Sequence, residues 1–365
     1  MATPTLTRRP ARRSTFHRLT VAGVDRLCAD AVAVTFAVPP DLAEEYEFRA
    51  GQYLTLRRQV NGQEERRSYS ICAPVGAAPR IGVRRVAGGL FSAWLVDAVR
   101  PGDVVEVLPP LGAFCPDPEA PAHHCLVAAG SGITPVLSIV SSVLAANPAS
   151  RVTLLYGNRR TDTVMFAEEL ADLKDRYRSR LQLVHVLSRE PRDVELFSGR
   201  LDADRLRRLL DGVVPAADVD EWWLCGPYGM VRDAEAVLAE RGVPKDRVHH
   251  ELFYVDEPPP EPARPEDVST VDGPTSEVVV QLEGRATALT LPRDTPILDA
   301  AQRVRADLPF ACRGGVCGTC RARVVEGEVR MRRNYALEDH EVAAGFVLTC
   351  QSLPVTDHVT VDYDA

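Results

Sequence analysis

Four cysteines near the C-terminal end of the chain follow one pattern, and this pattern limits the possible fold more than any other feature. Three lie in a single glycine-rich loop and the fourth lies 30 residues farther along: Cys312, Cys317, Cys320 and Cys350. The spacing C-x4-C-x2-C with one distant cysteine is the known ligand spacing of plant-type [2Fe–2S] clusters. We therefore expect a cluster here, with Gly314, Gly315 and Gly318 adopting positive φ angles so that backbone N–H groups reach its sulfur atoms.

The alternative to a cluster is a structural zinc site. Zinc sites usually combine short C-x2-C units, and a loop with three cysteines and one distant partner fits that arrangement poorly. The other five cysteines are scattered along the chain: Cys28, Cys72, Cys115, Cys125 and Cys225. Because the total of nine is odd and no secretory signal precedes them, we expect no disulfides.

A proline-rich acidic stretch separates the cysteine loop from most of the chain. Residues 256–274 read DEPPPEPARPEDVSTVDGP and contain almost nothing to bury, which predicts a linker. Residues 275–365 are then expected to form a small α+β domain of β-grasp type, built around the cysteine loop. In it we expect strands at Val278–Leu282 and Ala288–Leu291 and a helix at Ile297–Ala306.

Residues 16–118 are expected to form a small antiparallel β-barrel. Short alternating or β-branched runs are separated by turn signals such as Asn61-Gly62. The predicted strands include Ala33–Val38, Tyr53–Leu56, Ile81–Val86 and Val104–Val107. Ahead of them, residues 1–15 carry four arginines but no apolar segment of a Sec or Tat signal, which predicts a disordered basic tail.

Residues 119–255 alternate strand-like and helix-like segments, which predicts a parallel sheet with helices on both faces. The predicted strands are Cys125–Ala128, Val152–Tyr156, Leu181–Val186 and Glu221–Cys225. The predicted helices are Pro135–Ala146, Phe166–Arg176, Ala203–Leu210 and Met230–Arg241. The whole chain is thus expected to be a multidomain protein that joins a barrel, an α/β domain and a small α+β domain.

The barrel block contains a motif suited to a flat ring system and its phosphates. Arg67-Ser-Tyr69-Ser70 lies at the end of a predicted strand. There an arginine can neutralise a pyrophosphate, a tyrosine can pack against a ring and a serine hydroxyl can reach the ring's edge. Farther along, residues 88–92 (GGLFS) could offer backbone N–H groups and a hydroxyl to phosphate oxygens. For so short a string, an ordinary strand end is the alternative.

Two strand-to-helix junctions of the α/β block have the composition of ligand-binding turns. Residues 130–135 (GSGITP) follow one strand and open a helix, so the glycines permit a close approach and the helix N-terminus favours a phosphate. Cys225-Gly226-Pro227 joins a later strand to its helix. Both junctions belong to the carboxyl edge of the sheet, where open parallel sheets bind ligands.

In this order, the motifs resemble the ferredoxin–NADP reductase superfamily. Its members combine a flavin-binding barrel carrying R-x-Y-S with a nucleotide domain that has a G-x-G-x-x-P turn and a later C-G-P. The C-terminal cysteine module narrows the resemblance, which covers nearly everything from Phe16 to Asp362, to reductase components of multicomponent oxygenases. Longer strings, such as AAGSGITPVLSI and MRRNYALEDHEVAAGFVLTCQSLP, are similar to a subgroup that serves phenylacetyl-CoA ring epoxidation. Only the resemblance brings in that substrate.

The resemblance implies roles for individual residues. Those implied to bind the flavin, with FAD favoured over FMN, are Arg67, Tyr69, Ser70, Gly89 and Ser92. Those implied to hold the nicotinamide nucleotide are Gly130, Gly132, Thr134, Pro135 and Gly226. Ser70 would lie near the flavin N5 edge where hydride arrives, and Cys225 would border the nicotinamide as a weak candidate for acid–base chemistry.

The resemblance also favours NADPH over NADH as the coenzyme. In NADPH-using relatives a Ser-Arg pair at the position of Ser188-Arg189 grips the 2′-phosphate, and Arg159 or Arg160 could assist. The alternative is that these arginines are solvated surface charges. Phe253 resembles the aromatic residue that covers the flavin ring, with a buried strand aromatic as the alternative.

We therefore expect a reductase that moves electrons from NADPH through FAD and the cluster to an oxygenase partner. The alternatives are a reductase for another diiron or Rieske oxygenase and, outside enzymes, a non-catalytic redox or zinc-binding module. A net charge of −8 offers no basic surface to nucleic acid. No apolar run approaches the roughly 20 residues of a membrane-spanning helix, so we expect no membrane association and a cytoplasmic location.

Overall fold

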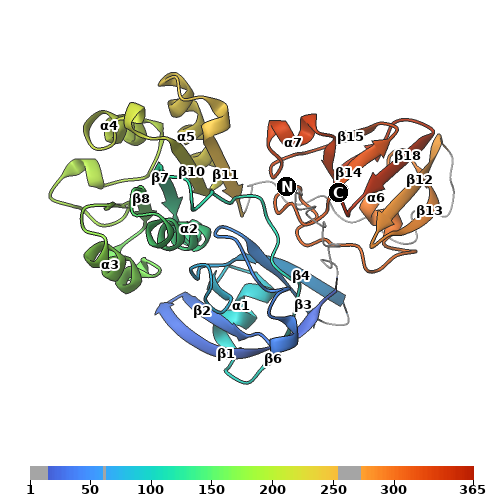
Figure 1. Ribbon diagram of the computed structural model, residues 1–365, viewed down its shortest axis with the longest axis horizontal. Coiled ribbons are helices and arrows are strands. Elements are labelled where there is room, and N and C mark those ends of the chain that lie inside the picture. The colour runs from blue at the N-terminus through green and yellow to red at the C-terminus, as the bar shows by residue number, and fades with distance from the viewer. Residues whose placement is uncertain (1–14, 61–62, 254–272) are drawn as a thin grey trace, which may run out of the picture. The chain divides into compact units, whose positions relative to one another are not determined.

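The first block is a closed antiparallel barrel in the computed structural model, which describes residues 15–60, 63–253 and 273–365. Its strands are β1 (His17–Cys28), β2 (Ala31–Ala37), β3 (Tyr53–Val60), β4 (Gln63–Ser70), β5 (Arg80–Arg84) and β6 (Val104–Val107). They pair in the order β4-β3-β6-β1-β2-β5, and a bridge between Ile71 and Ile81 joins the two ends of the sheet. The predicted antiparallel sheet is confirmed (Figure 1).

Alternation along these strands fills the barrel with apolar side chains. Leu19, Phe36 and Leu54 are fully buried there, and burying a side chain of this size contributes about 1.5–3 kcal/mol. Helix α1 (Leu90–Asp97) packs on the barrel through Phe91 and other buried residues. The same helix supports the end of β4, because the Phe91 ring packs against Tyr69 of that strand.

The second block is a parallel five-stranded sheet, as its alternating segments predicted. The strands are β7 (His123–Ala129), β8 (Arg151–Asn158), β9 (Leu181–Leu187), β10 (Glu221–Gly226) and β11 (Val248–Leu252), in the order β11-β10-β7-β8-β9. The main helices are α2 (Ile133–Ala146), α3 (Ala167–Arg176), α4 (Ala203–Gly212) and α5 (Tyr228–Glu240). Because every strand runs the same way, the carboxyl ends of all five meet at one edge (Figure 1).

The barrel and the parallel sheet form one unit, Phe16–Glu257. Ala33 and Cys72 of the barrel share a buried core with Ile133 of α2. In addition, the Ser138 hydroxyl of α2 donates a hydrogen bond of 2.6 Å to the carbonyl of Ala73. This contact brings residues from the end of β4 beside the carboxyl edge of the sheet.

The second unit contains residues 273–365 and is the small α+β domain that the sequence predicted. Its strands are β12 (Thr275–Leu282), β13 (Arg285–Pro292), β14 (Arg321–Glu326), β15 (Val329–Met331), β16 (Phe346–Leu348), β17 (Ser352–Pro354) and β18 (His358–Asp362). A mixed sheet has the order β13-β12-β18-β14-β16, and β15 pairs with β17. The short helices are α6 (Ile297–Ala301) and α7 (Asp339–Ala343).

Helix α6 is shorter than the predicted Ile297–Ala306. After Ala301 the chain tightens, and the N–H of Arg303 bonds to the carbonyl three residues back. The tight turn lets the buried Arg305 side chain donate to the carbonyl oxygens of Leu282 and Arg285, at 2.8 and 2.7 Å. Tertiary hydrogen bonds to the β12–β13 hairpin therefore end the helix early.

Two predicted segments lie mostly outside the described residues, namely the basic tail (1–15) and the linker (256–274). Among the residues that are described, none of the helices has the length and apolar character required to cross a bilayer.

Candidate functional site

The four predicted cluster ligands lie in two pairs. The Cys312 thiol shares a hydrogen bond with the Cys317 thiol, and the Cys320 thiol shares one with Cys350. The bond to Cys317, helped by nearby backbone N–H groups, lowers the pKa of Cys312 below that of a free thiol. Each iron of a [2Fe–2S] cluster takes two protein ligands, so two neighbouring thiol pairs fit that cluster. In the described part of the chain, no group of three His, Cys, Asp or Glu side chains converges on a single metal ion. This agrees with ligands divided in two pairs between two iron atoms.

The backbone of the cysteine loop differs from the prediction at one residue. Gly315 and Gly318 have φ angles of 78° and 67°, as expected, but the third positive φ belongs to Arg313 (52°) and not to Gly314. The guanidinium of Arg313 donates hydrogen bonds to Asp299 and to Gln302. These bonds hold the unusual backbone conformation in place. Gly314 instead directs its N–H at the Cys312 sulfur, 3.4 Å away.

Side-chain donors also reach the cysteine sulfur atoms. The amide Nε2 of Gln351, which is fully buried, lies 3.6 Å from the Cys350 sulfur and donates to the Arg313 carbonyl at 2.7 Å. Thr319 makes a hydrogen bond to Cys317. Donors to ligand sulfur atoms stabilise the more negative, reduced form of a cluster. Sequence reasoning missed both residues, although each lies beside a ligand in the chain.

At the end of β4, a serine of the barrel meets a carboxylate of the parallel sheet. Ser70 is 3% exposed, and its hydroxyl donates to Oε2 of Glu251, on β11, at 2.9 Å. Burial raises the pKa of Glu251 to about 7, against the opposing effect of the Ser70 hydrogen bond. Cys225 pairs with Glu251 across β10 and β11, and burial together with the Glu251 charge raises the pKa of its thiol. The sequence singled out Ser70 and Cys225, and the structure connects them through Glu251.

The remaining predicted flavin residues lie on the barrel. Arg67 and Tyr69 are two residues apart on β4, so their side chains leave the same face of the strand. Tyr69 packs against Phe91 of α1, with ring centroids 6.1 Å apart. Gly89 precedes α1, and the buried Ser92 hydroxyl accepts a backbone N–H near the start of that helix. Their roles toward a flavin stay predictions.

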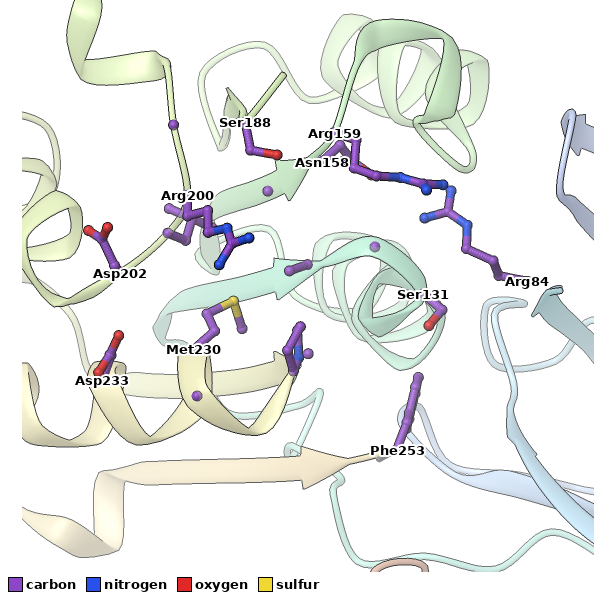
Figure 2. A pocket seen from close by; sticks show the side chains of 18 residues that line it. Arg84, Ser131, Asn158, Arg159, Ser188, Arg200, Asp202, Met230, Asp233 and Phe253 are labelled. Atoms are coloured by element: carbon purple, nitrogen blue, oxygen red, sulfur yellow. The ribbon is translucent and has the colours of Figure 1, made fainter. Parts of the chain in front are cut away.

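A cavity of about 650 Å³ opens at the carboxyl edge of the parallel sheet (Figure 2). Its volume is in the usual range of cofactor sites, roughly 300–1,000 Å³. The lining residues come mostly from strand ends and the turns that follow them. Five residues that the sequence had assigned to cofactor binding are among them: Gly130, Arg159, Ser188, Gly226 and Phe253.

Other residues of the predicted phosphate turn lie beneath the cavity surface. Gly132, Thr134 and Pro135 are buried. A Cβ atom on Gly132 would lie 2.1 Å from the Cys225 carbonyl oxygen, so only glycine lets the turn approach β10 this closely. The Thr134 hydroxyl donates to the Ser131 carbonyl at 3.0 Å. These residues therefore shape the turn, and Gly130 above them faces the cavity.

The arginine predicted to bind the 2′-phosphate does not line the cavity. Arg189 is exposed and is absent from the cavity lining, which instead contains Arg200 together with Ser188. The Arg200 side chain extends into the cavity (Figure 2) and has no hydrogen bond or ion pair with any described residue. Nearby Asp202 and Asp233 accept backbone N–H groups of α4. Sequence reasoning missed Arg200.

Phe253 lines the same cavity directly after β11 (Figure 2). Its side chain is 40% exposed, so the alternative that it is a buried strand aromatic is wrong. An exposed ring at the edge of a cavity is free to lie against a planar ligand.

Three families match successive parts of the chain. Residues 18–115 match the family described as "Oxidoreductase FAD-binding domain". Residues 126–236 match "Oxidoreductase NAD-binding domain", and residues 280–355 match "2Fe-2S iron-sulfur cluster binding domain". The three matches correspond to the barrel, the parallel sheet and the C-terminal unit.

Curated relatives align with the chain over nearly their whole length. The chain is 44% identical to a subunit of 1,2-phenylacetyl-CoA epoxidase from Escherichia coli (strain K12), over 96% of this chain and 99% of that protein. It is 35% identical to the ferredoxin reductase component of 3-ketosteroid-9-alpha-monooxygenase from Rhodococcus rhodochrous, over 94% and 96%. The solved structure of phthalate dioxygenase reductase has the same fold, with a TM-score of 0.58 and 24% identity over 95% of this chain and 98% of that one.

Proposed function

The chain belongs to the family of reductase components of multicomponent oxygenases that have FAD-binding, NAD-binding and [2Fe–2S] domains, and on this premise we propose that it delivers electrons from NADPH to the oxygenase that epoxidises phenylacetyl-CoA. The observation that carries the proposal is the presence, in one chain, of a nucleotide-sized cavity and of two cysteine pairs suited to a two-iron cluster. The substrate is proposed from the 44% identity to the epoxidase subunit over 99% of its length.

The bound flavin would convert the electron pair of a hydride into single electrons, because nicotinamide gives electrons in pairs and an iron–sulfur cluster takes them singly. Arg67 and the start of α1 would face its phosphates, and Tyr69 and Ser70 would contact its ring. Cys312, Cys317, Cys320 and Cys350 would hold the cluster. The protein contributes by aligning donor and acceptor and by excluding water.

Ser70 would relay a proton between Glu251 and the flavin edge: when its hydroxyl passes its own proton toward the ring, it would take the proton of the Glu251 carboxyl in its place. Glu251, with a pKa of about 7, can carry a proton or release it near neutral pH. Its hydrogen bond of 2.9 Å to the Ser70 hydroxyl gives a short path between the two groups. Cys225 is fully buried, and its raised pKa keeps the thiol protonated. It would therefore contribute to the packing of the site and not to acid–base chemistry.

We further propose that NADPH is preferred over NADH because of Arg200. The Arg200 guanidinium has no carboxylate partner among the described residues, and it suits a 2′-phosphate by charge and by its fork of donors. Ser188, on the same cavity wall, would add a hydroxyl. In this proposal Arg200, and not Arg189 as the sequence predicted, contacts the 2′-phosphate of NADPH.

The proposal is tested by anaerobic titration of the purified protein, reconstituted with FAD and iron–sulfide, with NADPH and with NADH. Bleaching of the visible bands at lower NADPH than NADH, and substrate epoxidation when the phenylacetyl-CoA oxygenase components are added, is the expected result. Bleaching without epoxidation would keep the reductase and reject the partner. Turnover with a ketosteroid hydroxylase instead would assign the chain to the partner of its 35% identical relative. A colourless protein that NADPH does not reduce would reject the proposal.

A further inference from the structure

Three arginines gather around one carboxylate beside the cysteine loop of the C-terminal unit. Asp299, on α6, accepts a hydrogen bond of 2.9 Å from Nη1 of Arg313, which directly follows Cys312. Burial raises the pKa of the Asp299 carboxyl, and three nearby cations oppose this rise: Arg313, Arg332 and Arg303. Three positive charges therefore surround one negative charge, although the whole chain has a net charge of −8. We call these three arginines the arginine collar.

Two members of the arginine collar carry charges that no acidic side chain of the described residues neutralises. Arg303 and Arg332 are exposed, and neither forms an ion pair with a described residue. Arg332 donates a long hydrogen bond, of 3.5 Å, to the Cys350 carbonyl. The one carboxylate of the group already forms an ion pair with Arg313, so the collar keeps an excess of positive charge at the surface.

The arginine collar lies beside the cysteines that would hold the cluster. Arg313 follows Cys312 in the loop, and the Arg332 guanidinium lies next to the carbonyl of Cys350. Cys312 is half-buried, whereas Cys350 is buried. A protein that takes electrons from a cluster held here has to approach the loop closely, so it would meet the collar.

An exposed apolar residue adjoins the collar. Val304 directly follows Arg303 and is 61% exposed. Helix α6 buries Ile297 and Leu298 in the core of its unit, so Arg303 and Val304, after its end, are left at the surface. Interfaces between proteins are enriched in arginine and combine apolar contacts with charged groups. The composition of this surface therefore fits a protein partner.

We infer that the arginine collar, together with Val304, is a docking surface for an acidic face of the oxygenase partner. This inference rests on the proposed function and adds the chemistry of the partner's surface. Opposite charges steer two proteins together and orient them, and the effect weakens as the salt concentration rises. Docking at the collar would bring the cysteine loop against the partner, because Arg313 belongs to that loop.

The experiment compares Arg303→Glu with the control Arg323→Glu in the protein reconstituted with FAD and iron–sulfide. Arg323 is also exposed, but it lies on β14 beside the edge strand β16, whereas α6 packs near β13 at the opposite edge of the sheet. Binding to the purified phenylacetyl-CoA oxygenase components and NADPH-dependent turnover are measured at low and at high salt. Reversal of the Arg303 charge should raise the Kd and the KM for the oxygenase about tenfold at low salt, and the difference should shrink at high salt. The kcat at saturating oxygenase and the reduction of ferricyanide by NADPH should stay close to wild type.

The control variant should match wild type in every measurement. Arg303→Gln removes the charge without reversing it, so its effect should be smaller, and it serves if the glutamate variant does not fold. An unchanged Kd in Arg303→Glu, or tighter binding, would overturn the docking surface while leaving the reductase function intact. Slower reduction of the cluster bands by NADPH alone, with an unchanged Kd, would also overturn it, because the collar would then serve the chain's own flavin domain. A wild-type protein that NADPH reduces but that binds none of the oxygenase components would instead reject the proposed partner on which the inference rests.

Discussion

The Ser70 hydroxyl donates to the Glu251 carboxylate at 2.9 Å, although the two residues are 181 positions apart in the chain. Ser70 ends a strand of the barrel and Glu251 lies on the last strand of the parallel sheet. The hydrogen bond therefore joins the two domains at the point where the proposed flavin edge would meet the coenzyme. The same contact lies where burial raises the pKa of the Glu251 carboxyl.

Glu251 should make the stability of the flavin-free protein fall as the pH rises. Its carboxyl has a pKa of about 7 when folded and about 4.5 when unfolded, so between these values the folded state binds more protons. Stability is then highest below about pH 4.5 as far as this group is concerned, and the loss is complete above about pH 7. Glu251→Gln should remove this loss, which is on the order of 3 kcal/mol. Urea unfolding at several pH values measures it.

Glu47→Gln is the matched control for this measurement, because Glu47 is exposed. Its unfolding curve should follow that of wild type at every pH. If wild type and Glu251→Gln lost stability in parallel between pH 5 and 8, the raised pKa of Glu251 would be wrong.

Arg200 should determine the coenzyme preference. Arg200→Ala removes the guanidinium that extends into the cavity. The kcat/KM for NADPH should therefore fall roughly tenfold to a hundredfold, which corresponds to about 1.5–3 kcal/mol of lost transition-state stabilisation. The kcat/KM for NADH should change little. Arg189→Ala is the control, since its exposed side chain does not line the cavity. A variant at Arg189 that loses the NADPH preference, beside one at Arg200 that keeps it, would restore the assignment expected from the sequence.

The contrast between these two arginines shows what the sequence could and could not predict. The cysteine ligands were identifiable because three of them lie within nine residues, and their spacing alone reflects the cluster geometry. Ser188-Arg189 follows the right strand, but which arginine reaches the cavity depends on the path of residues 189–200, and no local pattern encodes that path. Strand and helix alternation predicted the parallel sheet because the pattern of burial repeats along the chain.

Properties created by packing were beyond sequence reasoning. The raised pKa of Glu251 and the burial of the Asn158 amide at the cavity arise only when distant segments of the chain come together. The positive φ of Arg313 was also missed, because three neighbouring glycines offered more favourable positions for it. In each case the tertiary structure overrides the local preference.

Gln351 should raise the reduction potential of the cluster. Its buried amide lies 3.6 Å from the Cys350 sulfur and can donate to it, and such a bond favours the reduced, more negative state. Gln351→Leu should therefore lower the potential, as measured by redox titration of the reconstituted protein with electron paramagnetic resonance. Gln281→Leu, on β12, is the control and should leave the potential unchanged. An equal or higher potential in Gln351→Leu would contradict the hydrogen bond.

Gly132 should be required for the nucleotide turn to form. A Cβ atom there would lie 2.1 Å from the Cys225 carbonyl oxygen and 3.0 Å from the Gly226 nitrogen, and both are backbone atoms that cannot rotate away. Gly132→Ala must therefore push the turn away from β10, at a cost of about 3 kcal/mol in unfolding free energy. Because the displaced turn carries Gly130, KM for NADPH should rise as well.

In Gly212→Ala, at the end of α4, an added Cβ atom meets nothing within 4 Å, so this control should keep wild-type stability and KM. Thermal unfolding and the KM for NADPH are measured for both variants. A Gly132→Ala protein as stable as the Gly212→Ala control would show that the turn does not need this close approach to β10.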